Sequence, residues 1–210
     1  MGYSLTWMAD ALRAGGCTVV ERPGWQSRGH GNMGTVRGIL CHHTAGPRTG
    51  DAPSLNVVEN GRPGLDGPLA QLFLSRSGVF YVVAAGRCWH AGPGEYRGIT
   101  MGNSEMIGIE AENTGLDNDQ PWPEVQMDAY AAGVAALANH LGIPTVMVAG
   151  HKEYAPRRKI DPTFSMDDFR AKVDELRNAG AAREANVDHG TVRASSLNLR
   201  NGPGTNYEVL

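Results

Sequence analysis

The chain has few cysteines, few aromatic residues and no large excess of charge of either sign. Its three cysteines, Cys17, Cys41 and Cys88, are odd in number and widely spaced, which argues against a disulfide framework and favours synthesis in a reducing compartment. Lys and Arg number 19 against 22 Asp and Glu, so the net charge of -3 argues against a broad basic surface and a nucleic-acid partner. No apolar run approaches the ~18 residues of a membrane span, so no membrane insertion is expected.

The composition that remains is that of a folded globular chain with many turns. Hydrophobic residues make up 41% of the 210 residues and charged residues 20%, too apolar and too weakly charged for intrinsic disorder. Gly and Pro number 28 and 12, which disfavours an all-helical fold. Residues 1–7 lack a basic segment followed by an apolar core, so no secretory signal is visible.

Helical and extended patterns alternate along the chain, which favours an α/β domain of about 180 residues. The predicted helices are 4–14, 54–60, 124–141 and 167–178. The predicted strands are 17–20, 35–43, 106–113 and 144–149, with a hairpin formed by 69–74 and 79–84. Residues 61–68 are predicted to be a Gly/Pro loop and residues 180–188 a polar linker.

Four residues could form a metal-dependent hydrolytic site. His42 ends a predicted strand, Glu110 lies on another, His151 follows a third, and Asp161 comes ten residues later. Zinc hydrolases use three His, Cys or carboxylate ligands and keep one position open for water. The spacing alone is weak evidence, because there is no HExxH motif and the chain has seven histidines.

Four motifs together resemble the zinc-dependent N-acetylmuramoyl-L-alanine amidases of the amidase-2, or peptidoglycan-recognition-protein-like, superfamily. They are the segments 39–46 (ILCHHTAG), 89–92 (WHAG), 107–110 (IGIE) and 150–162 (GHKEYAPRRKIDP), and the last is the most specific. The resemblance covers roughly residues 30 to 175. It implies a central mixed β-sheet flanked by helices, with zinc in a groove at one face.

Matched by position, the resemblance assigns His42, His151 and Asp161 as the zinc ligands, with Asp where other members have Cys. It assigns Glu110 as the base that takes a proton from a zinc-activated water, and Lys159 as the residue that stabilises the tetrahedral oxyanion. Another branch of the superfamily has a Tyr at the position of Ala70. Its absence here leaves the base function to Glu110.

The bond implied is the amide between the lactyl group of N-acetylmuramic acid and L-Ala of the stem peptide, with bacterial peptidoglycan as partner. His90 resembles a histidine that contacts substrate in the groove. Trp89 and Tyr154 are candidates for lining a saccharide groove, with packing in the core as the alternative for both. We expect the enzyme to act as a monomer.

The end of the chain resembles the start of a bacterial SH3-like domain, carried by the run LNLRNGPG within residues 192–210. This divides the chain into a catalytic domain (1–182), a linker (183–191) and an incomplete SH3-like β fragment, too short to close a barrel. Such modules commonly bind cell walls in lytic enzymes. The analogy predicts a phage endolysin that is made without a signal peptide in the cytoplasm of the bacterial host and acts at the wall after release.

Three other functions stay open at this point. A cytoplasmic amidase that recycles soluble muropeptides also uses an Asp-type site, but the wall-binding tail argues against it. A non-catalytic peptidoglycan-recognition module would have lost a ligand, and none is missing here. A Cys/His peptidase built on Cys41 would keep its activity in EDTA and lose it in Cys41→Ala.

Overall fold

The computed structural model describes residues 3–116 and 122–185. By internal contacts the chain divides into residues 1–179 and 180–210, and the architecture below is that of the first unit. Its centre is a six-stranded mixed sheet with the strand order β1-β6-β5-β7-β2-β8. Every neighbouring pair of strands is parallel except β5 and β6, which are antiparallel. The mixed α/β sheet expected from the sequence is therefore confirmed.

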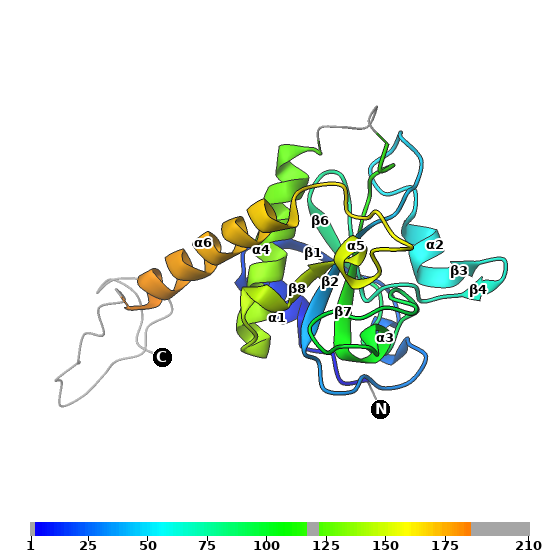
Figure 1. The fold of residues 1–210 in the computed structure, drawn as a ribbon, viewed down its shortest axis with the longest axis horizontal. Coiled ribbons are helices and arrows are strands. Elements are labelled where there is room, and N and C mark those ends of the chain that lie inside the picture. The colour runs from blue at the N-terminus through cyan, green and yellow to red at the C-terminus, as the bar shows by residue number, and fades with distance from the viewer. Residues whose placement is uncertain (1–2, 117–121, 186–210) are drawn as a thin grey trace, which may run out of the picture. The chain divides into compact units, whose positions relative to one another are not determined.

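The helices and strands alternate through most of the chain (Figure 1). The strands of the main sheet are β1 (Thr18–Glu21), β2 (Gly38–His43), β5 (Leu72–Leu74), β6 (Val79–Val82), β7 (Met106–Ala111) and β8 (Val148–Gly150), and a separate ribbon pairs β3 (Gly61–Arg62) with β4 (Leu65–Asp66). The α-helices are α1 (Met8–Ala14), α2 (Leu55–Asn60), α3 (Gly102–Glu105), α4 (Glu124–Leu141), α5 (His151–Tyr154) and α6 (Met166–Ala185). Two short 3-10 turns, η1 (Trp25–Ser27) and η3 (Thr145–Met147), complete the described elements.

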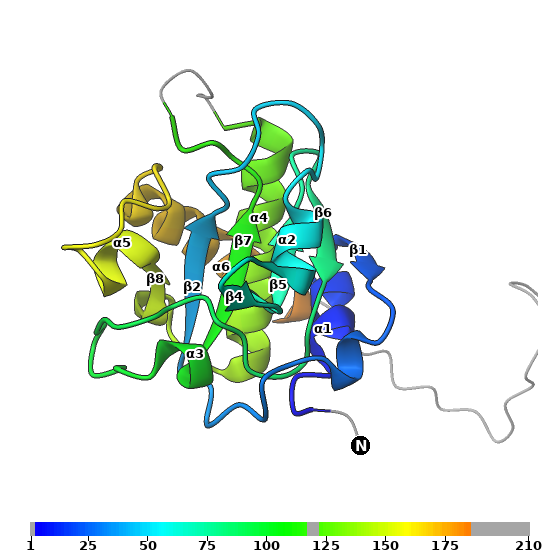
Figure 2. The same cartoon turned by 90° about the vertical axis from the view of Figure 1, so that its right-hand side faces the viewer.

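The two faces of the sheet are covered differently (Figures 1 and 2). Helices α1, α4 and α6 pack on one face and form the main core with the side chains of the strands. The Ala-rich interior of α4 is buried there, and the helix ends at Gly142 in the left-handed conformation. The other face carries α2, α3, α5 and their long connections, so that loop residues on this face meet side chains at the ends of the strands.

The register of three adjacent parallel strands brings the distant site residues together. His42 of β2 lies opposite Glu110 of β7, and Cys41 lies opposite Gly150 of β8. His151 comes directly after Gly150, so it lies next to His42 on the other side. Because parallel strands end at the same edge of a sheet, residues 151, 42 and 110 form one row at the carboxyl ends of β8, β2 and β7.

Several predicted elements are shorter in the structure by two to four residues at an end, and three differ in kind or extent. Residues 61–68, predicted as a loop, contain the β3–β4 ribbon. The predicted strand 144–149 is shortened to Val148–Gly150, because residues 145–147 form a 3-10 turn after Pro144. The last helix runs to Ala185 instead of residue 178, and so extends into the predicted linker, because Ala-rich sequence favours helix and one glycine costs only about 1 kcal/mol.

No helix in the described part of the chain is long and apolar enough to cross a membrane. The predicted SH3-like fragment at residues 192–210 lies outside the described residues, as does most of the predicted linker. The predicted division into a catalytic domain, a linker and an SH3-like fragment stays a prediction.

Candidate metal centre

Three ligand atoms converge at the carboxyl end of β2. The Nδ1 atoms of His42 and His151 are 2.9 Å apart, and each is 3.2 Å from Oδ2 of Asp161. Among the described residues, this His-His-Asp group is the one whose ligand atoms could hold a metal ion. Donors 2.0–2.1 Å from a tetrahedral zinc lie about 3.3 Å from one another, so this triangle has the size that zinc requires.

The outer nitrogens of both histidines are committed to other partners. His151 Nε2 lies 2.9 Å from the carbonyl oxygen of Ala91, an acceptor, so this nitrogen carries the hydrogen. His90 Nε2 likewise lies 3.2 Å from the carbonyl oxygen of Met106, which leaves Nδ1 of His90 as an acceptor. His42 Nε2, 3.2 Å from that Nδ1, therefore donates to it.

This arrangement of hydrogens leaves a lone pair on both Nδ1 atoms of the triangle. Asp161 supplies a carboxylate oxygen as the third acceptor. Three acceptors facing one another without a hydrogen between them repel, unless a cation lies among them. The donor set therefore fits a divalent metal by its chemistry as well as by its size.

Burial and mutual contacts set the ionisation of these groups. Burial lowers the pKa of His42 to about 4, which keeps it neutral and able to bind a metal. Burial opposes ionisation of Asp161, but its interactions with His151 and His42 outweigh burial and lower the pKa of Asp161 below its usual range. At neutral pH the triangle thus consists of neutral imidazole at His42 and a carboxylate at Asp161.

Glu110 lies beside the triangle with an uncommitted oxygen. Its Oε1 is 3.9 Å from Nδ1 of His42, and its Oε2 is buried without a hydrogen-bond partner in the described structure. Burial raises the pKa of Glu110 to about 8, and the charge of Asp161 adds to this while Lys159 opposes it. A buried carboxylate with a raised pKa next to a metal site is suited to accept and return a proton.

The backbone of His42 is fixed from the opposite face of the sheet. The hydroxyl of Tyr130 on α4 accepts a hydrogen bond from the His42 N–H at 3.1 Å and lies 3.0 Å from the carbonyl oxygen of Ile109. Cys41 belongs to the core on this face, and burial raises the pKa of its thiol to about 12. The interpretation of Cys41 as a peptidase nucleophile is therefore wrong, because the thiol faces away from the groove and stays protonated.

Asp161 is brought to the histidines by the short helix α5. The N–H of Lys152 donates to the carbonyl oxygen of Asp161 at 2.6 Å, which ties the loop after α5 to its first turn. Glu153 accepts from the N–H of Gly150 at 2.8 Å and pairs through both oxygens with Arg170 of α6, each at 2.9 Å. The ligands that follow β8 are thus anchored to the helix behind the sheet.

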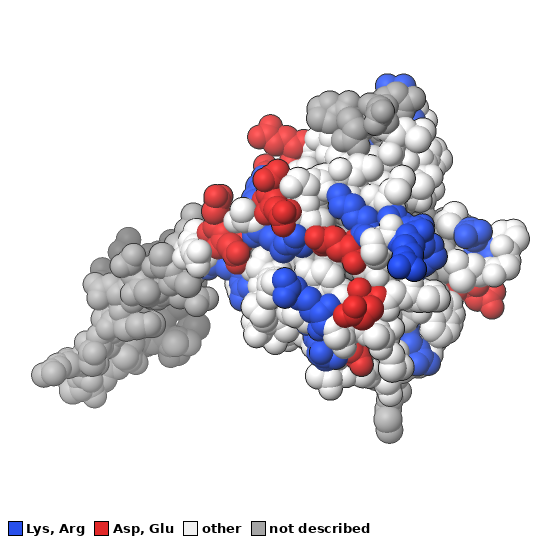
Figure 3. Space-filling model, in the orientation of Figure 1, with Lys and Arg blue, Asp and Glu red and all other residues white. Residues whose placement is uncertain are grey.

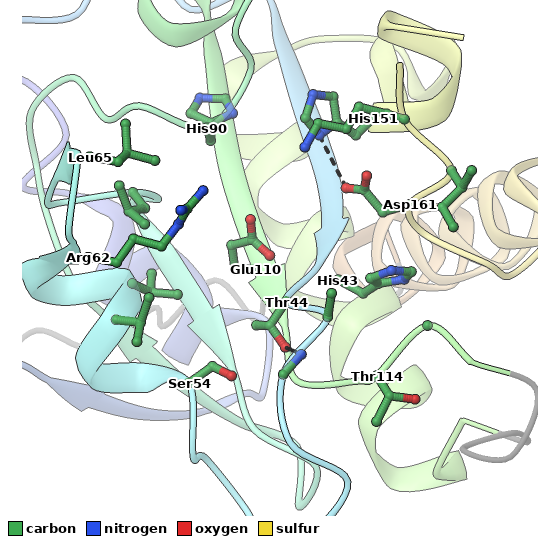
Figure 4. Close-up of a pocket in the computed structure, with 18 of the residues that line it drawn as sticks. His43, Thr44, Ser54, Arg62, Leu65, His90, Glu110, Thr114, His151 and Asp161 are labelled. Carbon is green, nitrogen blue, oxygen red and sulfur yellow. Dashed lines mark hydrogen bonds and ion pairs between the residues drawn. The ribbon is translucent and has the colours of Figure 1, made fainter. Parts of the chain in front are cut away.

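The triangle opens into a groove of about 900 Å³ (Figure 4). Figure 4 shows His90 at one end, Glu110 in the middle, and Ser54 and Thr114 toward the other end. The walls come from the Thr44–Pro47 loop, from α2 with the β3–β4 ribbon, and from segments 114–116 and 158–161. Lys159 lines this groove, as its predicted role requires, and the role itself stays a prediction.

The three predicted substrate contacts have different outcomes. Trp89 lines the groove and is 37% exposed, so it is placed to touch a ligand. Tyr154 takes the alternative that the sequence left open and packs in the core: it is 1% exposed, and its hydroxyl lies 2.9 Å from the carbonyl oxygen of Thr100. His90 lines the groove, but His42 and Met106 occupy both of its ring nitrogens, so its geometry is that of a residue that orients His42.

Several polar residues that shape the groove carried no motif of their own. Buried Glu112 accepts from the Thr44 hydroxyl at 2.8 Å and from the N–H and hydroxyl of Ser54 at 2.8 and 2.9 Å, which joins the loop after β2 to the start of α2. Arg62 reaches over the groove from the β3–β4 ribbon (Figure 4). Glu112 follows Glu110 by two residues, a spacing that places both on one face of an extended strand, whereas nothing in the sequence around residue 62 pointed to the groove.

Charges of both signs are interspersed near the site. On the face drawn in Figure 3, Lys and Arg side chains gather over the region of α5 beside Asp and Glu. That face carries no continuous basic surface, in agreement with the near-neutral composition.

A buried triangle of two histidines and an aspartate at the edge of a mixed sheet, with a free carboxylate beside it, is the arrangement that metal-dependent hydrolases use. The family model described as "N-acetylmuramoyl-L-alanine amidase" matches residues 32–164 of this chain. The chain belongs to this family.

Individual relatives agree with this assignment. The chain is 36% identical over 108 residues to "1,6-anhydro-N-acetylmuramyl-L-alanine amidase AmpD" of Citrobacter freundii, a match that covers 50% of this chain and 56% of AmpD. The chain spans about half the length of these curated relatives.

Solved structures share the fold. A selenomethionine derivative of AmpD aligns over 82% of this chain and 99% of its own, with a TM-score of 0.59 and 25% identity. The AmiD amidase from E. coli, in complex with the substrate anhydro-N-acetylmuramic acid-L-Ala-D-gamma-Glu-L-Lys, aligns over 73% of this chain and 65% of its own, with a TM-score of 0.54 and 22% identity.

Proposed function

We propose that the protein is a zinc-dependent amidase of bacterial peptidoglycan. It hydrolyses the amide bond between the lactyl group of N-acetylmuramic acid and L-Ala of the stem peptide. The observation that carries this proposal is the triangle of three facing acceptor atoms with the unpartnered Glu110 oxygen beside it, in a chain of the amidase family. The names of its relatives support the bond that is cleaved.

His42, His151 and Asp161 would hold the zinc ion. A bound zinc would supply Lewis-acid polarisation of the scissile carbonyl and make a water molecule more acidic. Glu110 accepts the proton of the attacking water at its free carboxylate oxygen and passes it to the departing amine. Lys159, a cation on the groove wall, stabilises the negative charge that develops on the carbonyl oxygen.

The test is mass spectrometry of peptidoglycan digested by the purified protein loaded with zinc. We expect new free carboxylates on the muramoyl lactyl groups and new amino termini on L-Ala. Glu110→Gln under the same conditions serves as the control for a contaminating amidase. Cleavage at a glycosidic bond, or within the stem peptide, would contradict the proposal.

For the biological role, we propose a lytic enzyme of the endolysin type that acts on polymeric cell wall. Support comes from the SH3-like run in residues 192–210, since such modules commonly bind walls. A muropeptide-recycling amidase is the second candidate, because the relatives at 31–36% identity are named 1,6-anhydro-N-acetylmuramyl-L-alanine amidases. Comparing rates on intact sacculi and on a soluble anhydromuropeptide separates the two.

A further inference from the structure

A second cavity, of about 250 Å³, adjoins the groove and shares Trp89 with it. Its lining includes the side chains of Arg87, Trp89, Thr100, Met101, Asn103 and Ser104. Apart from Trp89, which also lines the main groove, none of these residues carries a role in the proposed amide hydrolysis. The cavity is smaller than those that hold drug-sized ligands, and its size suits a single sugar ring.

The two cavities lie on opposite sides of the metal triangle along the strands. The second cavity is built around α3, which directly precedes β7, and so lies toward the amino-terminal end of that strand. The main groove extends the other way, past Glu110 to Thr44 and Thr114 at the carboxyl ends of β2 and β7 (Figure 4). A substrate whose scissile amide lies at the triangle, and which extends along the strands in both directions, reaches both cavities.

The chemistry of the linings differs between the two sides. The main groove has cations, Arg62 and Lys159, together with apolar side chains of α2, which suits a peptide with free carboxylates. A stem peptide linked through D-gamma-Glu, such as the one bound by AmiD, has such a carboxylate. The second cavity combines an aromatic ring and Met101 with hydroxyl and amide groups and has no Asp or Glu among its lining residues. Its one cation, Arg87, already lies over the Trp89 ring and donates to the carbonyl oxygen of His30, so the lining suits an uncharged sugar.

Two side chains of the second cavity are held ready for a ligand. The ring of Trp89 stacks on His30, with centroids 4.5 Å apart, and lies 5.4 Å from the Arg87 guanidinium carbon, yet stays 37% exposed. The Asn103 carbonyl oxygen accepts from the N–H groups of His90 and Ala91 at 2.9 and 2.7 Å, which fixes the orientation of its amide. The Asn103 NH₂ group donates to no residue that the structure describes, so it is free to bind a sugar oxygen.

We propose that the second cavity is a glycan subsite that binds the neutral N-acetylated sugar next to the N-acetylmuramic acid carrying the scissile amide. The proposal rests on the proposed amidase function, because it takes the metal triangle as the position of that amide. Contacts to a second sugar exist only when the substrate is a glycan chain. The subsite therefore favours polymeric peptidoglycan over a muropeptide with a single sugar.

The test fills the cavity from an exposed position. In Thr100→Trp the new ring occupies the space beside Met101, while the Thr100 carbonyl oxygen can still accept from Tyr154. The matched control is Thr18→Trp, which changes an exposed threonine of β1, outside both cavities. Each variant is assayed with zinc on two substrates, polymeric peptidoglycan and anhydro-N-acetylmuramic acid-L-Ala-D-gamma-Glu-L-Lys.

We expect Thr100→Trp to lose at least about tenfold in kcat/KM on the polymer and to stay within about twofold of wild type on the single-sugar substrate, a difference of about 1.4 kcal/mol or more in transition-state binding. Thr18→Trp should match wild type on both. Equal losses on the two substrates, or no loss on either, would overturn the subsite.

A binding measurement keeps the test valid if a variant folds poorly or if the wild type cleaves neither substrate. Calorimetric titration with the N-acetylglucosamine trimer needs no catalysis, and wild type and Thr18→Trp should bind it while Thr100→Trp should not. Met101→Ala, which removes an apolar wall without adding bulk, should weaken binding severalfold. Absence of binding to the wild type would overturn the subsite, whereas binding without any amide cleavage would overturn the proposed function and keep the subsite.

Discussion

His42 is held by three contacts, and each fixes a different property of the residue. The Tyr130 hydroxyl fixes its backbone, Nδ1 faces the other two ligand atoms, and Nε2 donates to His90. The last contact decides which nitrogen carries the hydrogen and so which one can bind a metal. Residues that hydrogen-bond to a metal ligand without touching the metal matter for binding, and replacing one commonly weakens metal affinity 10–100-fold.

Replacing His90 should therefore weaken zinc binding more than it destabilises the fold. In His90→Ala we expect the Kd for zinc to rise about 10–100-fold, measured by competition with a chromophoric chelator. His140→Ala is the control, because His140 stacks on Trp7 with centroids 3.8 Å apart, outside the groove. An unchanged Kd in His90→Ala would contradict the assigned hydrogen positions.

Glu110 should affect turnover without affecting metal content. Glu110→Gln keeps the shape of the side chain but cannot accept a proton, so we expect one zinc per chain and a kcat lower by about 10²–10⁴-fold. That loss is about 3–5 kcal/mol in the barrier at ~1.4 kcal/mol per tenfold. Zinc is measured by atomic emission, and exposed Glu124→Gln is the control. A rate near wild type would mean that another group is the base.

At the scale of elements, α5 is too short to hold its position by its own hydrogen bonds. It has four residues, and isolated helices of that length are unstable in water. The Glu153–Arg170 pair attaches it to α6, and Arg170 also pairs with Asp167 at 2.6 Å. Hydrogen bonding to Glu153 raises the pKa of Arg170, so this cation stays charged throughout the accessible pH range.

Removing Arg170 should lower the stability of the fold, because α5 loses its attachment to α6. For Arg170→Ala we expect the free energy of unfolding, measured in urea without zinc, to fall by about 1–3 kcal/mol, because charged hydrogen bonds are lost and Glu153 is left half-buried. Lys172→Ala is the control on the same helix: its pair with Asp128 is exposed, so the loss should stay below about 1 kcal/mol. Equal effects of the two substitutions would show that α5 does not depend on this anchor.

At the scale of the whole molecule, the three ligands join parts of the chain that are far apart. His42 ends β2, His151 starts α5, and Asp161 lies in the loop before α6. A metal ion held by all three links β2, the edge strand β8 through the helix that follows it, and that loop. Binding to the folded state alone must then stabilise the molecule by mass action.

Zinc should consequently raise the melting temperature, and EDTA should reverse the rise. At a free zinc concentration 100 times Kd the gain is about 2.7 kcal/mol, several degrees in a domain of this size. Scanning calorimetry of wild type and Asp161→Ala with and without zinc measures it, and the variant should show little of the gain. An equal shift in both proteins would place the stabilising ion elsewhere.

The sequence predicted the α/β class and every strand of the main sheet, because apolar periodicity and glycine or proline breaks are local signals. It also pointed to His42, Glu110, His151 and Asp161. The helix end at Ala185 and the β3–β4 ribbon were missed, because a glycine in a helix and a two-residue strand give weak local signals.

By itself, the sequence determined the chemistry of the site: two imidazoles, two carboxylates and a lysine, each beside a strand or in one loop. Only the tertiary structure decided that Tyr154 packs in the core and that both ring nitrogens of His90 are paired, one with His42 and one with the Met106 carbonyl oxygen. It also decided that a second cavity adjoins Trp89. Those outcomes depend on strand register and on contacts between residues far apart in the chain. Local sequence patterns specify neither, because they report which face of an element is apolar but not what packs against it.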